Sequence, residues 1–266
     1  MASFSVVTNL SSLNAQVNLQ STSMNLNKAL TRLSSGLKIN NSGDDAAGLA
    51  VANSYRSTTA VLNQGIQNAN DGLSTLQIKD GALANISTLL DRLSTLATQS
   101  ASSGFTGNRT QLNSEFQSVV SEITREANVA GLTASAGFSV YVSANGSNGS
   151  VGGTIGAADA TALSINALDI STAGGASTAV STVATAVTTL GNTQGTIGAL
   201  ENRLTYAIGL ANQQVVNNEA AESRLRDANI AKESANMTRY SVLNQSGIAA
   251  LAQANQQSSS VLRLLQ

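Results

Sequence analysis

The first forty residues carry two sets of apolar positions that recur mainly at spacings of three, four and seven. One set is Val6, Leu10, Leu13, Val17 and Met24. The other set is Leu19, Leu26, Leu30, Leu33 and Leu37. These spacings predict a helix from about residue 6 to residue 35, with Gly36 as its stop signal. At about 100° per residue the two sets lie on roughly opposite faces, so this helix must be covered from two sides.

Further helical patterns follow along the chain. A continuous pattern from Asp44 to Ala101 predicts one helix, about 80 Å long at about 1.5 Å per residue. Residues 111–129, 177–221 and 225–265 predict a shorter helix, a return helix and a final helix. The stripe of the final helix is Ile230, Met237, Tyr240, Leu243, Ile248, Leu251, Leu262 and Leu265. No third element remains in the chain to cover both faces of the first helix, so the terminal stripes need other partners.

The middle of the chain, about residues 131–176, is rich in Gly, Ser, Thr and Ala and carries few charges. Phe138, Val140 and Val142 alternate with small or polar residues, which is a strand signal, and a Gly-rich stretch typical of a turn follows. Residues 162–172 form a second candidate strand. We therefore expect a small β-hairpin region between two helical parts.

Composition excludes several functional classes. The 266 residues include no Cys and no His, and the net charge is -1. Without His or an activated Ser, no nucleophile and base can be assembled, which predicts a protein that is not an enzyme and binds no cofactor. The charge gives no case for a nucleic-acid or membrane partner. The sequence shows no secretory signal, and no segment reaches the roughly 20 apolar residues of a membrane span.

Two motifs have competing interpretations. Asp44 and Asp45 could bind a divalent cation, but adjacent positions on a helix do not face one another. We favour a helix start, with Ser42 and Asp45 in the form of a capping box. The stretch GSNGSVGGTIG, residues 146–156, could hold a phosphate, but no Lys-Ser/Thr follows it, which favours a turn.

Two longer stretches stand out: LTRLSSGLKINNSGDDAAGLAVAN, which begins at Leu30, and SRLRDANIAKESANMTRYSVLNQSGIAALAQANQQSSSVLRLLQ, which ends the chain. Both resemble the signatures of bacterial flagellins. The resemblance covers about residues 1–132 and 168–266. Departures are minor: Asn229 stands where the family usually has a second Asp, and Met237 where Leu is common. The short middle resembles a minimal member that lacks the outer variable domains.

The resemblance implies a mainly α fold, in which long antiparallel coiled-coil helices from both termini accompany a small central β-hairpin region. It implies an inner terminal-helix domain and connector, residues 1–43 and 222–266, and a core helical bundle, residues 44–221. The implied function is a structural subunit that polymerises into the helical flagellar filament used for swimming. A hook–filament junction protein and a non-polymerising secreted adhesin or surface ligand remain as alternatives.

The resemblance also implies partners and contact residues. Beyond other copies of the chain, the partners are the export apparatus and its chaperone, the filament cap and junction proteins, and Toll-like receptor 5. Export would leave the protein in the extracellular filament without a cleaved signal peptide. Polymerisation or packing of the terminal helices is expected at Val6, Leu10, Leu13, Val17, Met24, Leu26, Leu30, Leu33, Leu243, Leu251, Leu262 and Leu265. Receptor contact is expected at Arg92, Leu96 and Glu115, although Ser94 and Thr95 depart from the pattern of receptor-active members.

Overall fold

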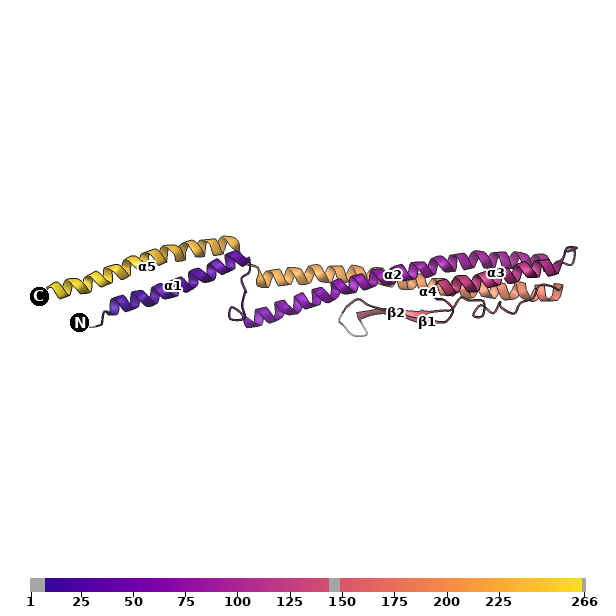
Figure 1. Ribbon diagram of the computed structural model, residues 1–266, viewed down its shortest axis with the longest axis horizontal. Helices are drawn as coiled ribbons and strands as arrows, with labels where there is room; N and C mark the ends of the chain where they lie inside the picture. Colours follow the sequence, from indigo (N-terminus) through magenta and orange to yellow (C-terminus); the bar gives the residue numbers. More distant parts are fainter. Residues whose placement is uncertain (1–7, 144–148, 265–266) are drawn as a thin grey trace. The chain divides into compact units, whose positions relative to one another are not determined.

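The computed structural model describes residues 8–143 and 149–264, which form five helices and two strands (Figure 1). The elements are α1 (Leu10–Ser35), α2 (Ala46–Ala101), α3 (Arg109–Val129), β1 (Ala136–Tyr141), β2 (Ser150–Ile155), α4 (Ala173–Arg226) and α5 (Ile230–Leu264). The mainly α fold with one small antiparallel hairpin is confirmed. Val6 and Leu265 lie outside the described residues, as does the side chain of Leu262.

Local capping explains where the helices begin and end. The Asn9 side chain accepts a hydrogen bond from the backbone N–H of Ser12 at the start of α1, and Gly36, with φ of 71°, ends that helix. The start of α2 differs from the sequence-based expectation. Asp45 is itself the cap, because its Oδ1 accepts from the backbone N–H of Gly48 at 2.9 Å. The Asp44 side chain is therefore available to contact Lys28 and Arg32 instead.

The chain divides into two compact units, and helices α2 and α4 each run through both. The first unit holds the residues up to Arg56 and those from Asn218 onward, and the second is Ser57–Asn217. The division into an inner domain of residues 1–43 and 222–266 and a core of residues 44–221 stays a prediction.

The second unit has a continuous hydrophobic core between α2, α3 and α4. Leu76, Leu83 and Leu90 of α2, Phe116 of α3 and Ile197 of α4 are all at most 1% exposed. Apolar side chains of mixed size, from Ala to Phe, repeat along the inner faces of the three helices, so one core joins them within the chain.

The hairpin packs on α2 and α4. Strands β1 and β2 pair antiparallel, with Val140 opposite Val151. Gly65 and Gly72 of α2 lie under β1: a Cβ atom on Gly65 would overlap the backbone carbonyl of Val142, and one on Gly72 would lie 2.7 Å from Cγ2 of Val140. These two glycines let the hairpin approach the helix closely.

The prediction of a second strand at residues 162–172 is wrong. The partner of β1 is Ser150–Ile155, part of the stretch expected to be a turn, and residues 162–172 form turns instead. Side chains of the helices satisfy the backbone there in place of a neighbouring strand. Ser100 donates to the carbonyl of Ile170 at 2.5 Å, and Gln117 donates to that of Leu168 at 2.6 Å. The alternating apolar residues of this loop face the core, so their pattern imitates a strand.

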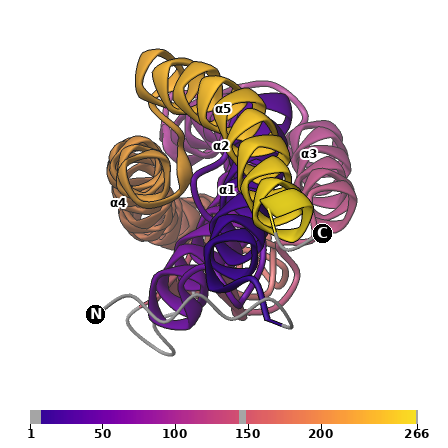
Figure 2. The same ribbon diagram turned by 90° about the vertical axis from the view of Figure 1, so that its left-hand side faces the viewer.

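In the first unit, α1 and α5 lie side by side and antiparallel (Figures 1 and 2). Just past the end of α1, the backbone N–H of Lys38 donates to the carbonyl of Arg226 at 2.6 Å, and that of Ala228 donates to Gly36 at 2.8 Å. These bonds set the register in which the two helices pair.

Candidate functional site

One face of α1 is covered by α5. Leu19, Leu26 and Leu33 are half-buried on this face, and Ala29 among them is 4% exposed. Leu19 lies against Gly247 of α5, where a Cβ atom would be 3.1 Å from its Cδ1. We call this contact between α1 and α5 the seam.

Polar pairs flank the seam and fix its register. Asn9 donates to the carbonyl of Ala254 at 2.9 Å, and the Asn244 amide donates to the Ser23 hydroxyl at 2.8 Å. A polar pair inside a coiled coil disfavours other registers, because a slip would separate its partners. The pairing of the two chain ends is therefore specified by both packing and hydrogen bonds.

No described residue covers the opposite face of α1. Four large apolar side chains lie along it: Leu10, Leu13, Val17 and Met24, exposed by 67%, 51%, 60% and 61%. We call these four the α1 stripe. Leu30, which the sequence grouped with the other set, is 44% exposed at the edge of the seam. The structure therefore shows both apolar faces of α1, and the described residues cover only one of them.

The apolar residues of α5 also lie on more than one face of the helix. Met237, Tyr240 and Leu251 are half-buried on the side that holds Gly247. Leu243 and Ile248, expected on the same stripe, are 47% and 55% exposed and point elsewhere. Their positions differ in angle around the helix from Leu251, so a single stripe could not contain all of them.

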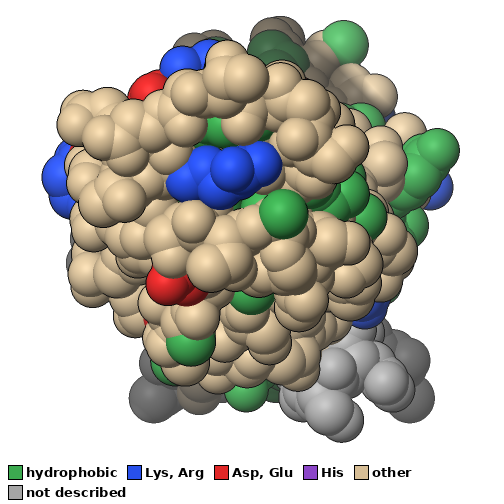
Figure 3. Space-filling view, turned by 90° about the vertical axis from the view of Figure 1, so that its right-hand side faces the viewer, with side chains coloured by type: hydrophobic (Ala, Val, Ile, Leu, Met, Phe, Trp, Pro, Cys, Tyr) green, Lys and Arg blue, Asp and Glu red, His purple; other side chains and the backbone are tan. Residues whose placement is uncertain are grey.

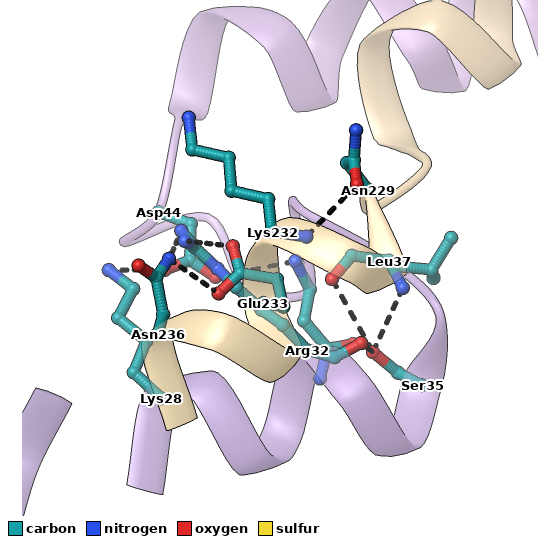
Figure 4. A network of polar contacts seen from close by, with 10 residues as sticks. Lys28, Arg32, Ser35, Leu37, Asp44, Asn229, Lys232, Glu233 and Asn236 are labelled. Atoms are coloured by element: carbon teal, nitrogen blue, oxygen red, sulfur yellow. Dashed lines mark hydrogen bonds and ion pairs between the residues drawn. The ribbon is translucent and has the colours of Figure 1, made fainter. Parts of the chain in front are cut away.

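A charged cluster closes one end of the α1 stripe (Figure 4). Asp44, in the connector before α2, lies 2.7 Å from the Nζ of Lys28 and 3.8 Å from the guanidinium of Arg32. Arg32 also reaches Glu233 of α5 at 3.5 Å. Lys28 follows Met24 by one helical turn, so the connector covers the outer face of α1 just beyond the stripe.

Several groups stabilise the ionised form of Asp44. The hydrogen bond from Lys28 and two from the backbone N–H groups of Asn40 and Asn41 lower the pKa of this carboxyl to about 2, against a smaller opposing effect of burial. Asp44 therefore keeps its charge beside Lys28 even in mildly acidic solution. Within residues 8–143 and 149–264, no three acidic side chains come together in a way that could hold a metal ion.

Comparisons with known proteins identify the family of this chain. Residues 6–134 match the model of the bacterial flagellin N-terminal helical region, and residues 180–265 match that of the C-terminal helical region. The chain is 36% identical to a flagellin of Halalkalibacterium halodurans, over 97% of this chain and 98% of that protein. The chain belongs to the bacterial flagellin family.

The chain also resembles a second flagellar protein and one solved flagellin structure. The chain is 34% identical to the flagellar filament 33 kDa core protein of Treponema phagedenis, over 97% of this chain and 98% of that protein. A crystal structure of Bacillus cereus flagellin has a TM-score of 0.47 and 26% identity, and covers 54% of this chain and 88% of that chain. The two flagellar relatives match over nearly the whole of this chain and of their own.

Family membership makes the chain a filament-forming structural subunit of the flagellum rather than an enzyme. On the face of the second unit that Figure 3 turns toward the viewer, charged side chains are few and are separated by uncharged ones. Among the described helices, none is long and apolar enough to cross a membrane.

The residues expected at a receptor contact separate in the structure. Arg92 of α2 and Glu115 of α3 form an ion pair with each other, and their side chains are 55% and 43% exposed. Leu96 is 2% exposed inside the bundle, so it offers no surface to a partner while the bundle is folded. The receptor contact itself stays a prediction.

The charged cluster was not anticipated from the sequence. Lys28 and Arg32 stand four residues apart, which only indicates a shared helix face. Their acidic partners Asp44 and Glu233 come from the connector and from α5, and Glu233 is 201 positions from Arg32. No local pattern could have paired residues so far apart.

Proposed function

We propose that copies of this chain assemble into the flagellar filament through the α1 stripe. The observation that carries this proposal is the set of four large apolar side chains on the face of α1 opposite the seam, which nothing in the described chain covers. Burying one such side chain contributes about 1.5–3 kcal/mol. An aligned stripe of them marks a contact surface rather than a solvated one.

The small number of fully buried side chains in the first unit supports the same proposal. Among its described side chains, the residues that reach full burial are Ala29, Ile39, Ala52 and Glu233. A helix pair draws most of its stability from tertiary packing of apolar faces. The second unit has that packing within one chain. The first unit obtains it from other copies, which couples its ordering to assembly.

A charge placed in the stripe tests this proposal. Met24→Asp introduces a carboxylate that would be buried without a partner in every subunit, so we expect filaments to fail. Asn25→Asp is the matched control: it puts the same charge on an exposed neighbouring position that points about 100° away. Sedimentation and negative-stain microscopy of both purified variants measure assembly. Normal filaments from Met24→Asp would refute the role of the stripe.

Export and partner contacts extend the proposal. We infer that the chain leaves the cell through the flagellar export apparatus without a cleaved signal peptide, and that a dedicated chaperone binds α5 before assembly. The support is the exposed apolar surface of α5, which offers a helix-in-groove ligand. The filament cap and junction proteins are proposed as further partners on the family resemblance. An unchanged chaperone affinity after removal of residues 225–266 would place that contact elsewhere.

Recognition by Toll-like receptor 5 is proposed through Arg92 and Glu115. Both are exposed, and Arg is common at energetically important contacts. We expect monomer to activate a receptor reporter cell weakly to moderately, and Arg92→Ala to abolish the response. An undiminished response from that variant would contradict the contact.

A further inference from the structure

The break between α4 and α5 is not explained by a helix-breaking residue. Helix α4 ends at Arg226 and α5 begins at Ile230, so three residues separate two long helices. Residues 210–246 contain no Gly, and the chain has no Pro. Sharp breaks in helices normally occur at Pro or Gly, at π-bulges, or where another group enters the hydrogen-bond ladder. The cause of this break therefore lies outside the two helices.

The connector after α1 enters the ladder at this break. The backbone N–H of Ala228 donates to the carbonyl of Gly36 at 2.8 Å. The backbone N–H of Lys38 donates to the carbonyl of Arg226 at 2.6 Å. All four residues belong to the first unit. We call these two hydrogen bonds the clasp.

The clasp replaces two bonds of a continuous helix one for one. In an α-helix each N–H donates to the carbonyl four positions earlier. Ala228 would then donate to Arg224. Arg226 would accept from Ile230. The ladder is still intact at the N–H of Asp227, which donates to the carbonyl four positions before it at 2.8 Å. The chain can therefore satisfy the same backbone groups in two ways, within one helix or through the clasp.

The broken form gains few other bonds at the junction. The N–H groups of Ile230 and Ala231 start α5, where no earlier turn of that helix can accept them. The N–H of Lys232 finds a capping bond to the Asn229 side chain, 3.0 Å long (Figure 4). Among the described residues, no group accepts from the buried Nε of Arg226. The clasp, rather than a surplus of bonds at the break, therefore holds the two helices apart.

We propose that the α4–α5 junction is a two-state hinge controlled by the connector after α1. With the clasp closed, the helix is broken and α5 starts beside the last turn of α1, where Arg32 reaches Glu233 at 3.5 Å. With the clasp open, residues 226–230 form one helix that continues α4 into α5, and the register that the clasp sets between α1 and α5 is lost. Pairing of the chain ends and breaking of the long helix are then one event.

Hydrogen exchange of the full chain as a monomer tests the hinge, by mass spectrometry of peptides that span residues 226–233. Asn229→Ala removes the cap and introduces the best helix former, so it favours the continuous helix without touching α1. The amides of Ile230 and Ala231 gain acceptors in that form. We expect their exchange to slow about tenfold, as it would with about nine junctions in ten helical. Asn217→Ala, at an exposed position inside α4, is the matched control and should leave these rates unchanged.

Further variants act on the clasp itself. Gly36→Val strains a backbone with φ of 71°, so it should open the clasp and slow the same two amides. If that variant does not fold, Lys38→Pro removes the other clasp donor instead. Ile230→Pro suits the first position of a helix but cannot continue one. Combined with either clasp variant, it should return the Ala231 amide to fast exchange.

The outcomes separate the parts of the proposal. Slow exchange in Asn229→Ala and in a folded clasp variant, reversed by Ile230→Pro, supports the hinge. Unchanged exchange in all of them overturns it. Slow exchange in Asn229→Ala alone overturns control by the connector. The rates are measured before polymerisation, so they do not depend on filament assembly.

Discussion

The carboxylate of Asp44 lies 2.7 Å from the ammonium group of Lys28, and this ion pair ties the connector to the outer face of α1. Lys28 sits one turn beyond Met24, the last residue of the α1 stripe. The pair therefore marks the point at which the outer face changes from apolar and uncovered to charged and covered. Arg32 and Glu233 extend the same network across to α5.

Stability of the first unit should depend on pH through Asp44. The pKa of this carboxyl falls from 3.8 to about 2 on folding, so its contribution is fully present above about pH 4 and is lost as the pH falls toward 2. Because the pair is partly solvated, we expect Asp44→Asn to cost on the order of 1 kcal/mol at pH 7. The variant should also lose less stability than the unmodified chain between pH 4 and pH 2.

Urea unfolding followed by far-UV circular dichroism at several pH values measures this dependence. Asp45→Asn is the control, because Asn also caps helices and Asp45 makes no ion pair with Lys28. Identical acid profiles for Asp44→Asn and the unmodified chain would show that the ion pair contributes nothing.

Two glycines of α2 should respond in opposite ways to alanine. Gly65→Ala drives a Cβ atom into the backbone of Val142 and should cost about 1–3 kcal/mol, because the hairpin must shift. Gly81→Ala meets no atom within 4 Å and should stabilise the chain by about 0.5–1 kcal/mol through the helix propensity of Ala. Thermal unfolding of the two variants compares them, and equal melting temperatures would refute the close approach of the hairpin.

The stability contributed by the loop between β2 and α4 should depend on the hydroxyl group of Ser100. Ser100 is fully buried and donates to the carbonyl of Ile170 at 2.5 Å. Ser100→Ala leaves that acceptor without this partner, so we expect a loss of about 1–3 kcal/mol. Ser103→Ala, on the exposed turn after α2, is the control and should be neutral. Chemical denaturation gives both values, and a neutral Ser100→Ala would mean that packing alone holds the loop.

Removal of both chain ends should leave a folded protein that does not assemble. A chain without residues 1–40 and 225–266 keeps the core of α2, α3 and α4 but loses the α1 stripe and the seam. We expect a cooperative thermal transition by circular dichroism and a monomer by analytical ultracentrifugation. Filaments formed by this truncated chain would show that the ends are not required.

The helices were predictable from sequence because their apolar residues recur with the period of an α-helix, which is a local property. The same period revealed from the sequence that α1 has two opposed apolar faces. Local patterns gave the wrong prediction in the middle of the chain. The alternating apolar residues of 162–172 belong to a loop that packs on the core, and the strand is the glycine-rich Ser150–Ile155. Strand pairing depends on which backbone lies alongside, and periodicity does not report it.

The sequence by itself therefore determined that α1 has an apolar stripe on each of two faces. Only the tertiary structure decided which face stays open. Leu19 packs against Gly247, which lies 228 positions later in the chain, while Val17 remains exposed. It likewise decided that Leu96 is core and that Asp44 pairs with Lys28. Each of these outcomes depends on contacts between residues far apart in the chain, which no local spacing encodes.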